Sequence, residues 1–212
     1  MLKCSTPDGI EGIITSSAGR PNTPSRCAQR LTASKGSSPN AIHDAVTRDY
    51  PRMRSFARAG FAAGPCLLKD TLQLSAFASN NFFLGHAAML VNEGLPNFIV
   101  TQLRDAGLSK KTVAILGMAF KGDSDDNRSS LSYKLKKLLQ VEARNVLCTD
   151  PFISDSRFVT VEEAIEQADV VILGAPHSAY RSLQFPEGKK VVDIWGFWRE
   201  NQNSVVGTKG AK

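Results

Sequence analysis

The sequence contains no apolar run approaching the roughly 20 residues that a membrane-spanning helix needs, so no such helix is expected. Its first residues do not lead into the apolar core of a signal peptide, which argues against export. The cysteines show no paired spacing, so neither a disulfide framework nor a metal site is predicted from Cys4, Cys27, Cys66 and Cys148. These absences favour a protein of the reducing cytoplasm.

The sequence also lacks the patterns that nucleic-acid-binding domains usually carry. It has no zinc-finger spacing, no helix-turn-helix pattern and no strand of interleaved aromatic and basic residues, although its net charge is +6. Part of this positive excess lies in the first 40 residues. The charge therefore favours a solvated basic surface that would also suit a diphosphate ligand, and nucleic acid is not expected as a partner.

Both ends of the chain differ from its middle. Residues 1–40 are dominated by Ser, Thr, Pro and Gly and sustain no helical or strand period, which predicts a disordered tail; an artefact of a shifted gene start would fit the same composition. Residues 201–212 are predicted to form a second tail. The remainder has the size and apolar content of a globular body with one or two domains.

Residues 41–107 are predicted to form a central helical segment that carries Cys66. Apolar residues recur at steps of three and four from Asp70 to about Glu93, a spacing that predicts one long helix. Gly94 is expected to end this helix, and Pro96 to start another that runs to about Ala106.

From residue 108 to 200 the pattern changes to short apolar runs that alternate with helical segments. Strands are predicted at 113–116, 146–149, 170–173 and 191–194, and helices at 130–141, 161–167 and, shorter, 178–183. Such alternation predicts an α/β fold, in which a Rossmann-like parallel sheet is covered by helices on both faces.

A glycine-rich turn presents one thiol in the run from Gly60 to Asp70, which reads GFAAGPCLLKD. Cys66 is followed three and four positions later by a cation, Lys69, and an anion. A lone cysteine is more often a small buried hydrophobe, as we expect for Cys148 in mid-strand. A thiol beside a cation on a tight turn, however, is how a covalent nucleophile is built.

A second polar segment, LGMAFKGDSDDNR, runs from Leu116 to Arg128 at the carboxyl end of the first predicted strand, where ligands dock in parallel sheets. The other strand ends are expected on the same rim and carry Asp150-Pro151, Pro176-His177 and Trp195-Gly196.

Metal coordination is not favoured at this rim. Its acids are better explained as turn and helix-N-terminal residues than as a cation site: Asp123, Asp125 and Asp126. His86 and His177 have no second ligand at metal spacing, so structural or surface roles are favoured for both.

These segments resemble two signatures of the UDP-glucose/GDP-mannose dehydrogenase family, whose members oxidise a nucleotide sugar twice with NAD to the uronic acid. GFAAGPCLLKD is similar to the family's catalytic stretch, G-x-x-x-G-x-C-x-x-K-D, and LGMAFKGDSDDNR to its substrate stretch, L-G-x-x-F-K-x-x-x-x-D-x-R. Residues 90–96 resemble the family's asparagine-to-proline segment, and Asp150-Pro151 its D-P after the next strand. The resemblance covers roughly residues 41–196.

The resemblance implies catalytic roles for Cys66, Lys69 and Asp70. Cys66 would attack the aldehyde formed from the sugar's primary alcohol, and Asp70 would position or activate the water that hydrolyses the resulting thioester. Lys69 would enhance the nucleophilicity of the thiol.

Ligand contacts are implied in the same way. The residues that match the family's substrate positions are Gly60, Phe120, Lys121 and Asp126. Arg128 matches an arginine on the cofactor side, and Arg52 lies where the family often carries a basic residue that reaches the substrate of a neighbouring subunit.

The resemblance implies NAD as cofactor, yet the family's NAD-binding turn is not found in the sequence. That turn is a G-x-G-x-x-G after an apolar strand, whereas Gly9, Gly12 and Gly19 lie in the Ser/Thr/Pro-rich tail. The chain therefore resembles the central and C-terminal part of the enzyme.

Three functional hypotheses follow. The chain is a UDP-glucose 6-dehydrogenase-like enzyme fragment that acts when another chain supplies the NAD domain, a UDP-sugar-binding module without turnover, or a folded gene remnant. By resemblance, the expected partners are a UDP-sugar and a second copy that dimerises through the central helix.

Overall fold

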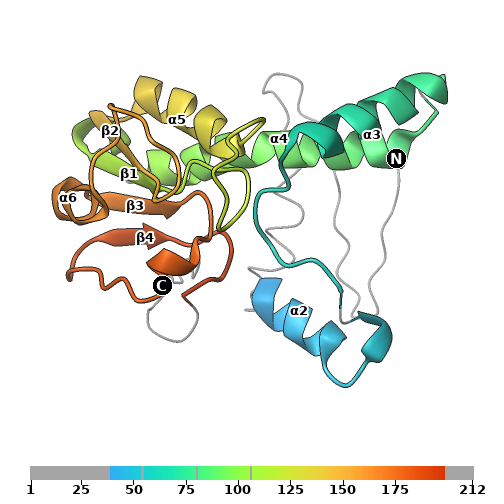
Figure 1. Cartoon of the computed structure of the whole chain (residues 1–212), viewed down its shortest axis with the longest axis horizontal. Helices are drawn as coiled ribbons and strands as arrows, with labels where there is room; N and C mark the ends of the chain where they lie inside the picture. The colour runs from blue at the N-terminus through green and yellow to red at the C-terminus, as the bar shows by residue number, and fades with distance from the viewer. Residues whose placement is uncertain (1–38, 54, 80, 106, 199–212) are drawn as a thin grey trace, which may run out of the picture.

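The computed structural model describes residues 39–53, 55–79, 81–105 and 107–198 (Figure 1). In chain order its elements are α2 (Pro39–Thr47), η1 (Pro51–Met53), α3 (Pro65–Phe77), α4 (Phe83–Arg104), η2 (Leu108–Lys110), β1 (Thr112–Leu116), α5 (Leu131–Glu142), β2 (Asn145–Thr149), α6 (Val161–Gln167), β3 (Val170–Leu173), η3 (Ser178–Tyr180) and β4 (Lys190–Val192). Both predicted tails lie outside the described residues, except that residues 39 and 40 begin α2.

The four strands form one parallel sheet in the order β2-β1-β3-β4. The chain leaves β1 for β2 on one side of it and then crosses back to β3 on the other side. The carboxyl ends of all four strands consequently lie along one rim, and the order reverses between β1 and β3, which is where ligands dock in open sheets of this kind.

Side chains of β1 alternate between two apolar cores. Val113 and Ile115 belong to the core that includes α4 and α5, whereas Ala114 and Leu116 belong to the core that includes α6 and the segment after β4. Both faces of the sheet are therefore covered, and the predicted α/β fold is confirmed.

The predicted long helix from Asp70 to Glu93 is wrong. Helix α3 ends at Phe77, the backbone of Ser79 turns to a positive φ of 49°, and α4 begins at Phe83. The Phe82 ring folds back over Gly85, where a Cβ atom would lie only 1.9 Å from it. An apolar spacing of three and four residues persists across this turn, and so the spacing alone could not reveal it.

The predicted break at Gly94 is also absent, because α4 continues through Gly94 and Pro96 to Arg104. Pro96 costs the helix one hydrogen bond. The turns that follow it bury Ile99, Val100 and Leu103 in the core beneath α5, which offsets that cost.

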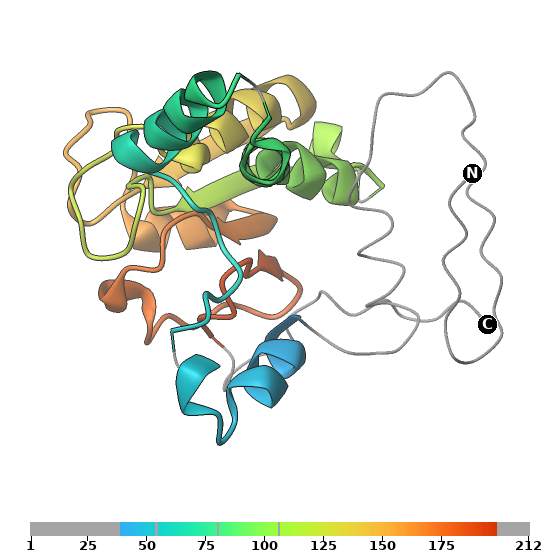
Figure 2. The same cartoon turned by 90° about the vertical axis from the view of Figure 1, so that its right-hand side faces the viewer.

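Figures 1 and 2 both show α2 and η1 set apart from α3 and α4, at the end of the segment that leads up to α3. Among the described helices, none is long and apolar enough to cross a membrane.

Candidate functional site

The glycine-rich turn from Gly60 to Cys66, called the cysteine turn below, lies between two aromatic side chains of the sheet domain. Gly60 has a φ of 145°, and a Cβ atom there would lie 2.2 Å from the Trp195 ring; Gly64 has a φ of 118°, and its Cβ atom would lie 3.1 Å from the Phe120 ring. Both positions thus require glycine, for backbone conformation and for space. The two predicted signature segments are brought together here on the rim of the sheet.

The Asn92 side chain of α4 holds the same turn through hydrogen bonds to its backbone. Its side-chain oxygen accepts a hydrogen bond from the Ala62 amide at 3.0 Å, and its amide group donates to the Ala62 carbonyl. The asparagine of the 90–96 segment therefore has a visible structural task, which is to hold the backbone that precedes Cys66.

Cys66 lies in the first turn of α3, directly after Pro65 at the first helical position, and its side chain is exposed. Proline at this position removes an amide that has no partner within the helix, so the turn tolerates it. The N-terminus of a helix favours negative charge, which suits a thiolate or an oxyanion formed beside it.

Lys69 and Asp70 lie on the next turn of α3, and the Lys69 Nζ atom is 3.5 Å from Asp70 Oδ1. Both side chains are mostly exposed. The three residues predicted as catalytic thus share the N-terminal part of one helix, while the specific role of each stays a prediction.

The loop after β1, residues 117–128, is called the rim loop below. Phe120 and Lys121 form the part of it that faces the cysteine turn. The Lys121 ammonium lies 5.4 Å from the centre of the Phe120 ring, and the Phe120 amide donates a hydrogen bond of 2.9 Å to the Asp126 carbonyl. An aromatic ring and a cation are thereby presented beside Gly64, at the position predicted to bind substrate.

Asp126 binds Arg128 within this loop. The Arg128 Nε atom is 3.0 Å from Asp126 Oδ1, and Nη2 is 2.7 Å from Oδ2. Hydrogen bonds from the Arg128 side chain and amide lower the pKa of the Asp126 carboxyl to about 2. The hydrogen bond to Asp126 and the charge of that carboxylate in turn raise the pKa of Arg128.

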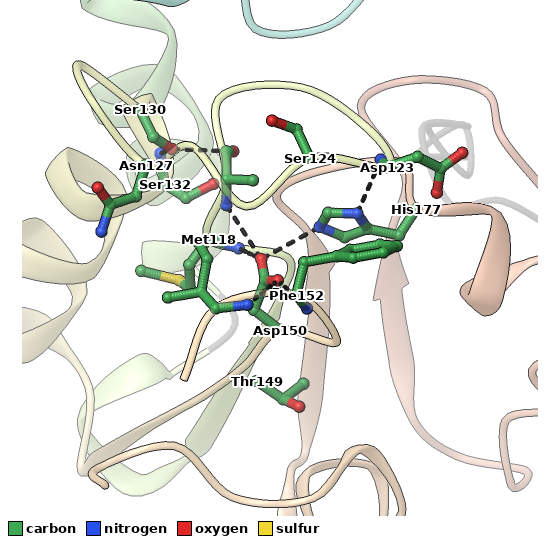
Figure 3. Close-up of polar contacts among 12 residues, drawn as sticks. Met118, Asp123, Ser124, Asn127, Ser130, Ser132, Thr149, Asp150, Phe152 and His177 are labelled. Atoms are coloured by element: carbon green, nitrogen blue, oxygen red, sulfur yellow. Dashed lines mark hydrogen bonds and ion pairs between the residues drawn. The ribbon is translucent and has the colours of Figure 1, made fainter. Parts of the chain in front are cut away.

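A carboxylate from the neighbouring strand end holds the start of the loop (Figure 3). Asp150, directly after β2, is fully buried through its side chain. Its Oδ1 accepts from the amides of Phe152 and Ile153, and its Oδ2 from those of Met118 and Ala119 and from the His177 ring. Burial alone would raise the pKa of this carboxyl, but the hydrogen bonds from His177, Phe152 and Met118 outweigh it and lower the pKa.

This arrangement does not fit NAD at the rim. In a dinucleotide-binding turn, amides at the strand-to-helix junction are free to meet phosphate oxygens. Here those of Met118 and Ala119 are taken by Asp150, and Gly117 and Gly174 pack against each other so closely that a Cβ atom on Gly174 would lie 2.3 Å from the Gly117 carbonyl. The described residues offer no alternative turn of the G-x-G-x-x-G type.

Arg52, a predicted ligand contact, is exposed on η1, which the figures show apart from the rim. Cys148 is buried in β2, as expected. Within the described part of the chain no cluster of three metal-ligating side chains occurs.

Sequence reasoning matched Asp150 to the family's D-P pair and favoured a structural or surface role for His177, but it did not predict that the two bind each other and the loop after β1. The available signal was that both follow predicted strands and therefore share the rim with the loop after β1.

A Rossmann-like domain whose rim loop packs against the cysteine turn is the arrangement to compare with known proteins. Residues 114–200 match the UDP-glucose/GDP-mannose dehydrogenase family, UDP binding domain. The UDP-N-acetyl-D-mannosamine dehydrogenase of Pyrococcus horikoshii is 28% identical over 152 residues, which are 68% of this chain and 36% of that protein.

Solved structures agree on the fold. A UDP-glucose dehydrogenase from Pyrobaculum islandicum matches with a TM-score of 0.68 and 28% identity over 82% of this chain and 44% of its own. The UDP-D-ManNAc dehydrogenase from Pyrococcus horikoshii matches with a TM-score of 0.72 and 23% identity over 85% of this chain and 46% of its own.

The match over residues 114–200 and the relatives, all nucleotide-sugar dehydrogenases, thus agree with the resemblance to the UDP-glucose/GDP-mannose dehydrogenase family that the two signatures predicted. It spans less than half the length of these relatives.

Proposed function

We propose that this chain is a cytoplasmic nucleotide-sugar dehydrogenase homologue that provides the UDP-sugar-binding part of the active site. It oxidises the sugar's primary alcohol to the uronate, with NAD, only when an NAD-binding domain is supplied from outside the described residues. The observation that carries this proposal is the packing of the cysteine turn on the rim loop, with Gly64 against the Phe120 ring.

The proposed binding roles follow from the chemistry of the rim. Lys121 supplies an ammonium for hydroxyl or phosphate oxygens, and the Phe120 ring an apolar wall for the sugar. Cys66, exposed at the start of α3, is the group that would bond covalently to an aldehyde carbon held there. Arg128 is proposed to act on the cofactor side, where it matches the family's arginine. Arg52 is proposed to act on the substrate of a second copy.

Calorimetric titration of the full chain with UDP-glucose, UDP-N-acetylmannosamine, GDP-mannose and NAD tests the binding role. Replacing Lys121 with Ala should weaken the binding of a UDP-sugar about tenfold or more. Lys137→Ala, which removes an exposed lysine on α5, is the matched control and should leave affinity unchanged. Equal affinity of the two variants would sink the assignment of Lys121.

A binding module without turnover is the second candidate, favoured by the occupied amides after β1 and the lack of an NAD-type turn among the described residues. Addition of an NAD domain as a separate chain separates the two. A catalytic chain should then convert UDP-sugar to the uronate as wild type but not as Cys66→Ser, because Cys66 acts on the aldehyde left by the first oxidation, whereas a binding module should form no uronate in either case. Alkylation of Cys66, followed by peptide mass spectrometry, tests only whether UDP-sugar covers the thiol, which both candidates predict.

Homodimerisation is proposed through the surface of α3 and α4. Large apolar side chains are exposed there, including Leu72, Leu74, Phe77, Phe83, Leu84, Leu90 and Val91. A hollow of about 380 Å³ between the two helices is lined by Leu74, Phe82, Ala88 and Met89, among others. Exposed apolar surfaces of this extent mark interaction sites.

Sedimentation velocity checks the dimer. Leu90→Lys on α4 should convert the chain to a monomer, whereas Val141→Lys, which alters an exposed apolar residue on α5, should not. A wild-type chain that stays monomeric at high concentration would refute the proposed interface.

A further inference from the structure

We propose that Asp150 and His177 form a buried latch that holds Phe120 and Lys121 in position for the ligand. The latch is a positioning device, since neither side chain is accessible to a ligand. Its importance for binding rests on the proposed function, whereas its existence can be tested without any ligand.

The latch grips the loop at two points (Figure 3). On one side of the tip, the amides of Met118 and Ala119 donate to Asp150 Oδ2 at 2.6 and 3.0 Å. On the other side, the Asp123 amide donates to His177 Nδ1 at 2.9 Å. Phe120, Lys121 and Gly122 are the three residues between these anchors, so the two groups predicted to bind the ligand are held from both ends.

His177 joins the anchors into one unit. Its Nε2 atom is 3.1 Å from Asp150 Oδ2, so Asp150 and Asp123 are linked through a single ring. Because Nδ1 accepts the Asp123 amide proton, it carries no hydrogen, and the hydrogen of the neutral ring lies on Nε2 and is donated to Asp150. The tautomer is therefore set by the loop it holds.

Surrounding groups keep the ring from turning. Its centre lies 5.1 Å from the Phe152 ring and 5.4 Å from the Tyr180 ring, and the Asp123 carboxylate accepts hydrogen bonds from the Ser178 amide and hydroxyl at 2.7 and 2.9 Å. Asp123 itself has a positive φ of 52°, a conformation that persists because the carboxylate and the amide are both bound.

Gly122 adds a third contact that holds the loop. A Cβ atom at this position would lie 2.5 Å from the Pro176 carbonyl oxygen, so the backbone of the loop tip presses directly on the segment after β3. The loop after β1 is thereby tied to the ends of both neighbouring strands, β2 through Asp150 and β3 through His177. This geometry fixes the direction in which Phe120 and Lys121 leave the rim.

Two substitutions each remove one of the two hydrogen bonds of the His177 ring. In His177→Asn the side-chain oxygen can replace Nδ1 and still accept the hydrogen bond from the Asp123 amide, while the hydrogen bond to Asp150 is lost. In His177→Gln the amide nitrogen can replace Nε2 and keep Asp150, while Asp123 is lost. His86→Asn, at an exposed position on α4, is the control.

Hydrogen exchange of the full chain without ligand gives the first readout. The amide of Asp123 should exchange about tenfold faster in His177→Gln, and those of Met118 and Ala119 in His177→Asn, while amides within β1 and β3 keep their protection. Unchanged exchange at residues 118–123 in both variants would overturn the latch. A uniform rise over the whole sheet would likewise overturn it, since the role of His177 would then be general stability.

Ligand affinity gives the second readout. Both variants should bind UDP-sugar about tenfold more weakly, with His86→Asn unchanged. Faster exchange at the loop with unchanged affinity would overturn the positioning role. A wild-type chain that binds no UDP compound would refute the proposed function, and the exchange pattern alone would then decide whether the latch exists.

A spectroscopic signature checks the wild type without substitution. Long-range ¹⁵N–¹H spectra of the imidazole should show His177 as the neutral Nε2–H tautomer. A ring protonated at Nδ1 would contradict the hydrogen bond from Asp123 and the latch with it.

Discussion

The sheet domain and the helical segment before it differ in how much of their apolar side chains they bury. In β1 and β3 nearly every apolar side chain is fully buried, whereas Phe77 and Leu84 on α3 and α4 are 90% and 82% exposed. The second half of α4, from Pro96 onward, lies in the sheet's core, and so one helix belongs to both regions. The sheet domain thus buries its apolar side chains within the chain, while the exposed part of the helices is the surface through which a second copy is proposed to bind.

The residues proposed to act on the ligand lie at the boundary of these two regions. Cys66 comes from the helical segment and Lys121 from the sheet, and the contact of Gly64 with Phe120 joins them. A site built this way depends on the stability of the sheet and on the orientation of the helices, and the two dependencies can be separated by substitution.

The largest expected effect is in the core of the sheet domain. Leu135→Ala should lower the free energy of unfolding by about 2–5 kcal/mol, because the side chain is fully buried between α5 and the sheet. Leu84→Ala should change it by less than about 0.5 kcal/mol in the monomer, since its side chain already meets water. Urea unfolding measures both, and similar losses would erase the proposed contrast between the regions.

Asp150→Asn should lower the free energy of unfolding by about 2–4 kcal/mol, because buried amides of the rim lose a carboxylate acceptor. The folded pKa of Asp150 is depressed, so its contribution is present above the unfolded pKa and is lost as pH falls through the folded pKa. Unfolding midpoints measured from neutral to acidic pH should therefore converge for wild type and variant. Curves that stay parallel would show that the charge of Asp150 is not what matters.

Gly60→Ala should destabilise by about 1–3 kcal/mol, since the new Cβ atom meets the Trp195 ring and the backbone conformation is one that L-residues avoid. Gly94→Ala is the matched change in the exposed part of α4, where nothing lies within 4 Å of a Cβ atom. It should stabilise by about 0.5–1 kcal/mol through helix propensity. Thermal unfolding distinguishes the pair, and a harmless Gly60→Ala would mean that the cysteine turn is not packed against Trp195.

The smallest effect concerns the exposed Asp126–Arg128 pair. Arg128→Ala should raise the pKa of the Asp126 carboxyl from about 2 toward its ordinary value, because the guanidinium hydrogen bonds are lost. In the wild type the folded pKa is depressed, so the contribution of the pair persists above the unfolded pKa and is lost only as pH falls through about 2. An NMR titration of Asp126 measures the shift, and an unchanged pKa would show that Arg128 does not hold the loop.

Sequence patterns predicted the sheet domain well, including helices α5 and α6, and the helical segment before it poorly. All four strands lie within two residues of their predicted positions, because a buried parallel strand is a short, nearly continuous apolar run between turn residues. The break after Phe77 was missed because the apolar spacing continues across it. The continuation through Gly94 and Pro96 was missed because local propensity disfavours it and burial of Ile99, Val100 and Leu103 overrides it.

The sequence by itself determined the α/β class, a parallel sheet of short strands and the two signature segments, because period, turn residues and motif spacing are local properties of the chain. Only the tertiary structure decided that Gly60 lies against Trp195, that Gly64 lies against Phe120, and that Asp150 and His177 hold the same loop. These contacts join residues up to 135 positions apart, from Gly60 to Trp195, and they follow from the way parallel strands bring their carboxyl ends to one rim. The predicted strands indicate that these segments share one rim, but which side chains meet there is decided only when the sheet has formed and α4 has packed against it.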